Sequence, residues 1–232
     1  MRTSFWTKLL DVISPRPCAI CGERLSANER ALCGACHLHL PLTHYELTPT
    51  DNPMARRFWG HFPVERAAAL FFYEAQAPVS QLIFDMKYHH RPEIAENMGF
   101  IMARQFAAAD FFNTIDALVP LPLTWRRQWH RGYNQSYELA RGISEATGLP
   151  IYQHVVKRVH FSQSQTKQHA WERLRNVEDA FRLVRPEKIA HRHLLLVDDI
   201  VTTGATVTAC AHELCKAAGV RISVLSLGLT KA

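Results

Sequence analysis

Apolar runs alternate along this chain with stretches of helical periodicity. The runs predict buried strands at 67–73, 115–119, 151–157, 181–184, 194–197 and 222–227. The periodic stretches predict helices at 79–88, 93–107, 135–147 and about 204–218. Alternating strands and helices are typical of a parallel α/β sheet with flanking helices.

The run 194–197 is too uniformly apolar for a half-exposed strand, and it ends in two carboxylates, Asp198 and Asp199. Such a run predicts a strand buried on both faces of a parallel sheet. Ligands of open parallel sheets bind at the carboxyl ends of the strands. We therefore predict that the acid pair lies at a ligand site.

A short Thr/Gly turn follows the acids and opens the next predicted helix. A helix start offers unpaired backbone N–H groups to an anion, and glycine lets the backbone approach it closely. Carboxylates accept hydrogen bonds from vicinal sugar hydroxyls, so the pattern predicts a ribose 5-phosphate site. The predicted phosphate-binding residues are Thr202, Thr203, Gly204, Ala205 and Thr206.

Other interpretations of these residues remain open. Solvated acids before an ordinary threonine cap would give a similar pattern, and response-regulator receivers also carry paired acids near strand ends. The chain has neither a G-x-x-x-x-G-K-[ST] loop nor a G-x-G-x-x-G loop.

Three arginines, Arg126, Arg127 and Arg131, follow the predicted strand 115–119. If the two strands are parallel, these arginines lie at the same edge as the acids. Guanidinium groups suit a diphosphate because their planar fork makes paired hydrogen bonds. The alternative is a solvated basic loop, just as Asp85 and Lys87 at a predicted helix end can be a solvated cap.

A long polar stretch without glycine, 162–169, precedes further basic residues. Loops of this length are usually functional or disordered, so it is either a loop that closes over a charged substrate or a surface loop. The candidate residues of this flexible loop are Gln165, Lys167 and Arg173.

Two short cysteine pairs lie near the N-terminus, at Cys18 and Cys21 and at Cys33 and Cys36. Pairs with this spacing can present four thiolates to one tetrahedral zinc, a closed structural site. Disulfides, reduced thiols or a redox role are the alternatives. No secretory signal is evident, which argues against disulfides and predicts a cytoplasmic protein.

The chain has 232 residues, 47% of them hydrophobic, and a net charge of +6. We predict a helix and zinc module in 1–40, a linker in 41–60 and an α/β domain in 61–232. No apolar run is long enough for membrane insertion. The positive charge excess lies between 120 and 190, where interleaved tryptophans could stack on bases, so single-stranded DNA is a candidate partner.

Several motifs in this order resemble one known family. The cysteine pairs are followed by VPLPLTWRRQWHRGYNQSYELARGIS, ERLRNVEDAF and LLLVDDIVTTGATV. The last motif resembles the phosphoribosyl diphosphate (PRPP) motif of type I phosphoribosyltransferases. Together they resemble the ComF family of competence and DNA-utilisation proteins, in particular its enterobacterial branch, over nearly the entire chain.

The resemblance implies a type I phosphoribosyltransferase-like fold behind a zinc finger, with a role in taking up or using external DNA. On this hypothesis Asp198 and Asp199 are the candidate catalytic residues and hold the ribose hydroxyls directly or through the magnesium that accompanies PRPP. Other DNA-uptake proteins are candidate partners. The substrate of any transfer is not implied. The alternative is a non-enzymatic adaptor for nucleic acid or protein that retains a PRPP-type pocket.

Overall fold

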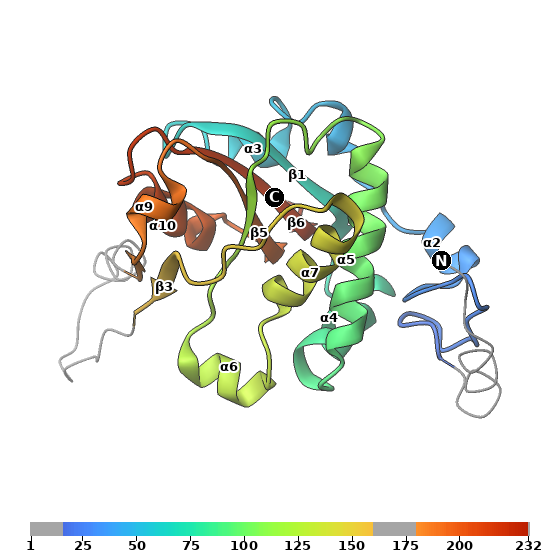
Figure 1. Cartoon of the computed structure of the whole chain (residues 1–232). Coiled ribbons are helices and arrows are strands. Elements are labelled where there is room, and N and C mark those ends of the chain that lie inside the picture. Colours follow the sequence, from blue (N-terminus) through green and yellow to red (C-terminus); the bar gives the residue numbers. More distant parts are fainter. Residues whose placement is uncertain (1–15, 160–179, 232) are drawn as a thin grey trace.

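The computed structural model describes residues 16–159 and 180–231 (Figure 1). A four-stranded sheet lies at its centre, between helices on both faces. In chain order the elements are α2 (Gly34–Leu38), η1 (Tyr45–Leu47), α3 (Pro53–Arg56), β1 (Val64–Tyr73), α4 (Val79–Tyr88), α5 (Pro92–Ala107), β2 (Ala117–Pro120), α6 (Trp125–Arg131), α7 (Gln135–Thr147), β3 (Val156–Arg158), β4 (Phe181–Leu183), α9 (Pro186–Ile189), β5 (His193–Val201), α10 (Ala205–Leu214) and β6 (Arg221–Thr230).

The sheet has the order β1-β6-β5-β2, and every neighbouring pair is parallel. Successive residues of β5 point to opposite faces: Leu195 packs in the core beneath α4, α5 and α7, and Leu194 in the core beneath α3 and α10. Burial on both faces explains why the strand is uniformly apolar. The predicted parallel α/β sheet with flanking helices is confirmed.

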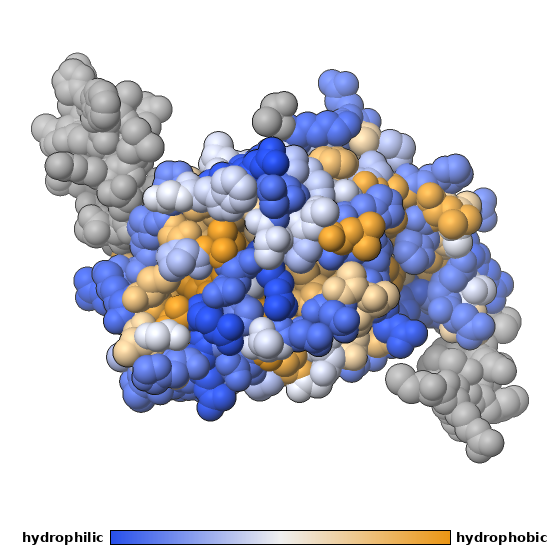
Figure 2. Space-filling view, turned by 90° about the horizontal axis from the view of Figure 1, so that it is seen from above, coloured by the Kyte–Doolittle hydropathy of each residue, from blue (hydrophilic) through white to orange (hydrophobic). Residues whose placement is uncertain are grey.

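Most predicted elements agree closely with the structure. The helix predicted at 79–88 is α4, and the helix predicted at 135–147 is α7, which ends at Gly148 with a φ of +76°. The last strand is longer than predicted, and α10 ends at Leu214 rather than near 218. None of the helices within the described residues is both long and apolar enough to span a bilayer. Seen from above, hydrophobic residues form separate groups among hydrophilic ones (Figure 2).

The strand predicted at 151–157 is wrong as a member of the parallel sheet. Only Ile151 forms a bridge, to Leu118, and the chain then turns at Gln153 and His154. The following residues form β3, which pairs antiparallel with β4 in a separate two-stranded sheet. Val155 and Val156 are buried in the core beneath α10, whereas Ile151 packs against the opposite core, so the apolar run reflects packing on both faces rather than one strand of the sheet.

The segment 41–60, expected to be a linker, carries η1 and α3 and packs against the sheet. Asn52 caps α3 by accepting hydrogen bonds from Met54 N and Ala55 N, and its amide donates to Ala67 O of β1 at 2.8 Å. Phe58 is fully buried. This segment therefore contributes to the core rather than spanning between modules.

The cysteine module lies at one end of the molecule and contacts α5 and α7 (Figure 1). The Arg30 guanidinium makes a bidentate ion pair with Glu145 of α7, at 2.8 and 3.1 Å, and lies over the ring of Phe100 of α5 at 3.5 Å. Leu32 belongs to the same hydrophobic cluster as α5. The module and the sheet domain thus share one contiguous core.

Candidate functional site

The acid pair lies near the carboxyl end of β5, as the sequence predicts. Asp198 Oδ1 accepts hydrogen bonds from Ser136 Oγ of α7 at 3.2 Å and from Asp199 N at 2.8 Å. The Lys87 ammonium lies 3.0 Å from Asp199 Oδ2. The acids are thus held by two helices that are distant in sequence.

Burial, reinforced by the neighbouring charge of Asp199, raises the pKa of Asp198 to about 8. The hydrogen bonds from Ser136 and the Asp199 amide, and the charge of Lys87, oppose this shift but do not cancel it. Arg158 is a further charged neighbour of this carboxyl. Burial and the adjacent Asp199 therefore favour the protonated form of Asp198.

This shift predicts a pH-dependent stability. The folded protein keeps the Asp198 proton up to about pH 8, whereas the unfolded chain loses it near pH 3.8. The contribution to the free energy of unfolding is thus fully present below pH 4 and declines as pH rises to about 8. Denaturant unfolding from pH 5 to 9 should show this decline relative to Asp198→Asn, and parallel curves for the two proteins would contradict it.

The turn after β5 is exposed and leads directly into α10. Thr202, Thr203 and Ala205 are exposed, so the first turn of α10 faces solvent. Gly204 caps the helix with a φ of +85°, a left-handed conformation that favours glycine. A Cβ atom at this position would lie 2.9 Å from Phe58 Cε1. The Phe58 ring therefore packs directly against the backbone of Gly204.

Arg57 also holds this turn, and no pattern in the sequence indicated this role. Its Nη1 donates to Thr202 O and its Nη2 donates to Thr230 O at 2.6 Å, bridging the ends of β5 and β6. Arg57 and Phe58 both come from the segment expected to be a linker. Segment 41–60 thus holds the turn through the hydrogen bonds of Arg57 and the packing of Phe58.

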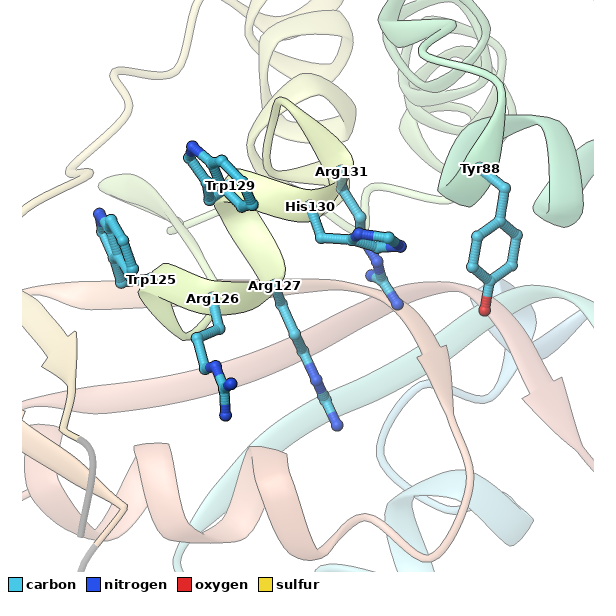
Figure 3. Close-up of a pocket in the computed structure, with 7 residues that line it drawn as sticks. All are labelled: Tyr88, Trp125, Arg126, Arg127, Trp129, His130 and Arg131. Carbon is cyan, nitrogen blue, oxygen red and sulfur yellow. The ribbon is translucent and has the colours of Figure 1, made fainter. Parts of the chain in front are cut away.

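The three arginines lie on α6, which follows β2. Since β2 pairs parallel with β5, α6 follows the same edge of the sheet as the acids. Arg126, Arg127 and Arg131 line a cavity of about 710 Å³ together with Tyr88 of α4. Figure 3 shows their guanidinium groups pointing to one side of α6; Trp125, Trp129 and His130 also line the cavity.

The residues after Arg131 anchor α6 to the rest of the site. Tyr133 Oη donates to Met86 O at the end of α4, and Asn134 Nδ2 donates to Leu121 O at 3.0 Å. Gln135 Oε1 accepts from Arg131 Nη1 at 2.9 Å. Residues 133–135 therefore form hydrogen bonds with α4, with the loop after β2 and with the guanidinium of Arg131.

Lys87 and Asp85 do not form a solvated cap. Lys87 reaches the acid pair, and Asp85 is buried, accepting from Gln81 Nε2 at 2.7 Å and lying 3.0 Å from His89 Nδ1. The predicted loop residues Gln165, Lys167 and Arg173 lie outside the described residues.

The four cysteines form one cluster. The Sγ atoms of Cys18, Cys21, Cys33 and Cys36 all lie within 4.8 Å of one another, and those of Cys21 and Cys33 are 3.7 Å apart. Four thiolates about 2.3 Å from one zinc would lie about 3.8 Å apart, so this cluster fits the ion. Burial alone would raise the pKa of Cys18, but hydrogen bonds from backbone N–H groups outweigh it and lower the pKa to about 7.

None of the protein-family models searched matches the chain. Among curated proteins, the chain is 32% identical over 213 residues to the DNA utilization protein YhgH of Escherichia coli (strain K12), covering 90% of this chain and 88% of that protein. It is 31% identical over 154 residues to Competence protein F of Haemophilus influenzae, covering 65% of this chain and 67% of that protein.

Solved structures that resemble this one include the glutamine PRPP amidotransferase from B. subtilis. That alignment has a TM-score of 0.41 at 18% identity and covers 61% of this chain and 30% of the other. Adenine phosphoribosyltransferase from Saccharomyces cerevisiae aligns with a TM-score of 0.36 at 12% identity, over 60% and 72% of the two chains.

Proposed function

This chain belongs to the ComF family of DNA-utilisation and competence proteins, and from that premise we propose that it binds PRPP and acts in the uptake or use of extracellular DNA. One observation supports the ligand most strongly. The acid pair, the exposed turn at the start of α10 and the arginine-lined cavity all belong to the carboxyl edge of one parallel sheet.

Each part of the site matches one part of PRPP. Asp198 and Asp199 hold the ribose hydroxyls, and the turn from Thr202 to Thr206 holds the 5-phosphate through backbone N–H groups at the helix start. The arginines of α6 neutralise the diphosphate. In a transfer at this site, a nucleophile attacks the anomeric carbon as the bond to diphosphate breaks, through an oxocarbenium-like transition state.

Two metals enter the proposal. Zinc is held by the four cysteines and has a structural role, since four protein ligands leave no open position. Magnesium accompanies PRPP, because it prefers phosphate oxygens and few protein ligands. We assign the protein to the cytoplasm, where reduced thiolates persist.

Titration calorimetry with PRPP and magnesium tests the proposal directly. The protein should bind PRPP and, more weakly, ribose 5-phosphate. Repeating the titration with candidate bases present would identify an acceptor. Failure to bind either ligand would leave the adaptor function described below.

Arg131→Ala should weaken PRPP binding far more than ribose 5-phosphate binding. A lost charge-assisted hydrogen bond costs on the order of 1.5–3 kcal/mol, about 10- to 100-fold in Kd. Arg192→Ala is the matched control, because Arg192 pairs with Asp116 at the opposite end of β5. An equal loss for both ligands would place Arg131 elsewhere in the site.

Arg57→Ala should weaken binding of ribose 5-phosphate, because the turn loses the hydrogen bond to Thr202 O and, with it, the connection through Arg57 to Thr230 O. We expect roughly a tenfold rise in Kd, with partial recovery in Arg57→Lys. The neighbouring Arg56→Ala is the control, since Arg56 is exposed and contacts Asp51 and the exposed ring of Trp59 rather than the turn. Unchanged affinity in Arg57→Ala, measured by calorimetry, would contradict this role.

A second candidate function rests on the tryptophans of α6. The rings of Trp125 and Trp129 stack with centroids 6.5 Å apart and are 73% and 77% exposed. Exposed aromatics beside basic residues suit the bases of single-stranded DNA, so a DNA-binding adaptor is the alternative. An adaptor should show a steep fall of DNA affinity with salt and a loss in Trp129→Ala, whereas a small-molecule enzyme should show neither. Other DNA-uptake proteins are further candidate partners.

A further inference from the structure

The acid pair already has a cationic partner within the protein. Lys87 lies in the last turn of α4, and its Nζ is 3.0 Å from Asp199 Oδ2. Both side chains are largely buried, with 20% of Lys87 and 14% of Asp199 exposed. An ion pair in this setting is screened less by salt and water than one on the surface.

The other carboxylate oxygens are mostly engaged as well. Asp199 Oδ1 accepts from Ile200 N at 2.8 Å, and Asp198 Oδ1 accepts from Ser136 and from Asp199 N. Asp199 Oδ2 contacts the Lys87 ammonium, and within residues 16–159 and 180–231 Asp198 Oδ2 is the one oxygen of this pair with neither a hydrogen bond nor an ion pair. The pair therefore offers one free oxygen rather than a set of metal ligands.

Magnesium does not fit this arrangement. The ion needs near-octahedral oxygen ligands at about 2.0–2.1 Å, and an ammonium on the same carboxylate opposes it by charge and by space. The positive charge of Lys87 lies 3.0 Å from Asp199 Oδ2 and would repel a metal ion approaching that carboxylate.

We infer that Lys87 takes the place of a metal ion at the acid pair, so that Asp198 and Asp199 hold the ribose hydroxyls directly. Magnesium then acts only on the diphosphate half of the ligand, beside the arginines of α6. The ribose ligand in this inference rests on the proposed function, but the exclusion of a metal ion from the acid pair does not. Lys87 then determines whether ribose binding requires Mg²⁺.

The first experiment uses a metal alone. Calorimetry with Mn²⁺, a magnesium substitute, on the zinc-loaded protein should detect no binding at the acid pair. Lys87→Gln removes the charge with little change in length and should create a Mn²⁺ site, which Asp199→Asn added to Lys87→Gln should abolish. Mn²⁺ bound equally by the parent and by Lys87→Gln, in a manner sensitive to Asp199→Asn, would overturn the inference whatever sugar the protein binds.

The second experiment adds the sugar phosphate. The parent should bind ribose 5-phosphate with the same Kd with and without Mg²⁺, whereas Lys87→Gln should bind at least tenfold more weakly without Mg²⁺ and recover with it. Lys87→Arg should resemble the parent, and Lys216→Gln, at an ion pair with Glu213, serves as control. If the parent needs Mg²⁺ to bind ribose 5-phosphate, the inference about Lys87 is overturned and the proposed function is not. A parent that binds neither sugar overturns the proposed function, and the metal experiment then still decides the role of Lys87.

Discussion

Replacing Gly204 with valine should weaken binding of ribose 5-phosphate and PRPP about a hundredfold. Valine disfavours the left-handed φ of +85°, and its Cβ would lie 2.9 Å from the buried ring of Phe58. The turn must then shift and withdraw its N–H groups from the phosphate. Losing these hydrogen bonds to a charged group costs on the order of 3 kcal/mol, about a hundredfold in Kd.

The matched control is Gly148→Val. Gly148 also has a positive φ, +76°, but nothing lies within 4 Å of an added Cβ, and it caps α7 rather than α10. This variant should lose about 1–2 kcal/mol of stability and keep its affinity. Circular dichroism would establish that both variants fold. Affinity in Gly204→Val equal to that of the parent would remove this turn from the site.

Zinc should be present at about one ion per purified chain, and Cys33→Ser should lose it. Structural zinc contributes an apparent 10–16 kcal/mol in isolated zinc-finger peptides, so residues 18–36 should lose their fold. Because Leu32 and Arg30 pack against α5 and α7, the loss should also raise hydrogen exchange in those helices. The central strands β5 and β6 should stay protected.

Cys215→Ser provides the control for this experiment, since Cys215 is exposed and lies outside the cluster. It should keep the metal and the exchange pattern of the parent. Metal analysis that finds no zinc, together with four freely titratable thiols in the module, would rule the site out.

The sequence predicts best the features that one local pattern specifies. The uniformly apolar run before Asp198 requires burial on both faces, and the structure buries Leu194 and Leu195 on opposite faces of the sheet. Helices α4 and α7 follow from periodicity and, for α7, from the glycine that ends it. The cysteine cluster follows from spacing alone.

The parts that were missed depend on contacts between distant segments. Lys87 contacts Asp199, and Arg57 contacts Thr202 and Thr230, although these partners are far apart in the sequence. No periodicity encodes such a pairing, and a polar stretch with prolines looks like a linker whether or not it packs. The apolar run at 151–157 led to a wrong prediction of a strand in the central sheet. Residues buried beneath a helix and residues buried in a sheet are equally apolar, so the run alone does not distinguish the two.

The order of the strands has a consequence for synthesis on the ribosome. Within the four-stranded sheet β1 pairs only with β6. Val64 therefore cannot pair with Ile222 until the last strand has been translated. Domains usually fold as units once their chain has emerged, and an unpaired strand edge invites aggregation meanwhile. The Leu42–Phe71 bridge and the hydrogen bond from Thr43 N to Leu70 O give β1 an early partner from its own neighbourhood. The segment around Leu42 therefore covers the outer edge of β1, whereas the edge that meets β6 stays unpaired until the last strand has been made.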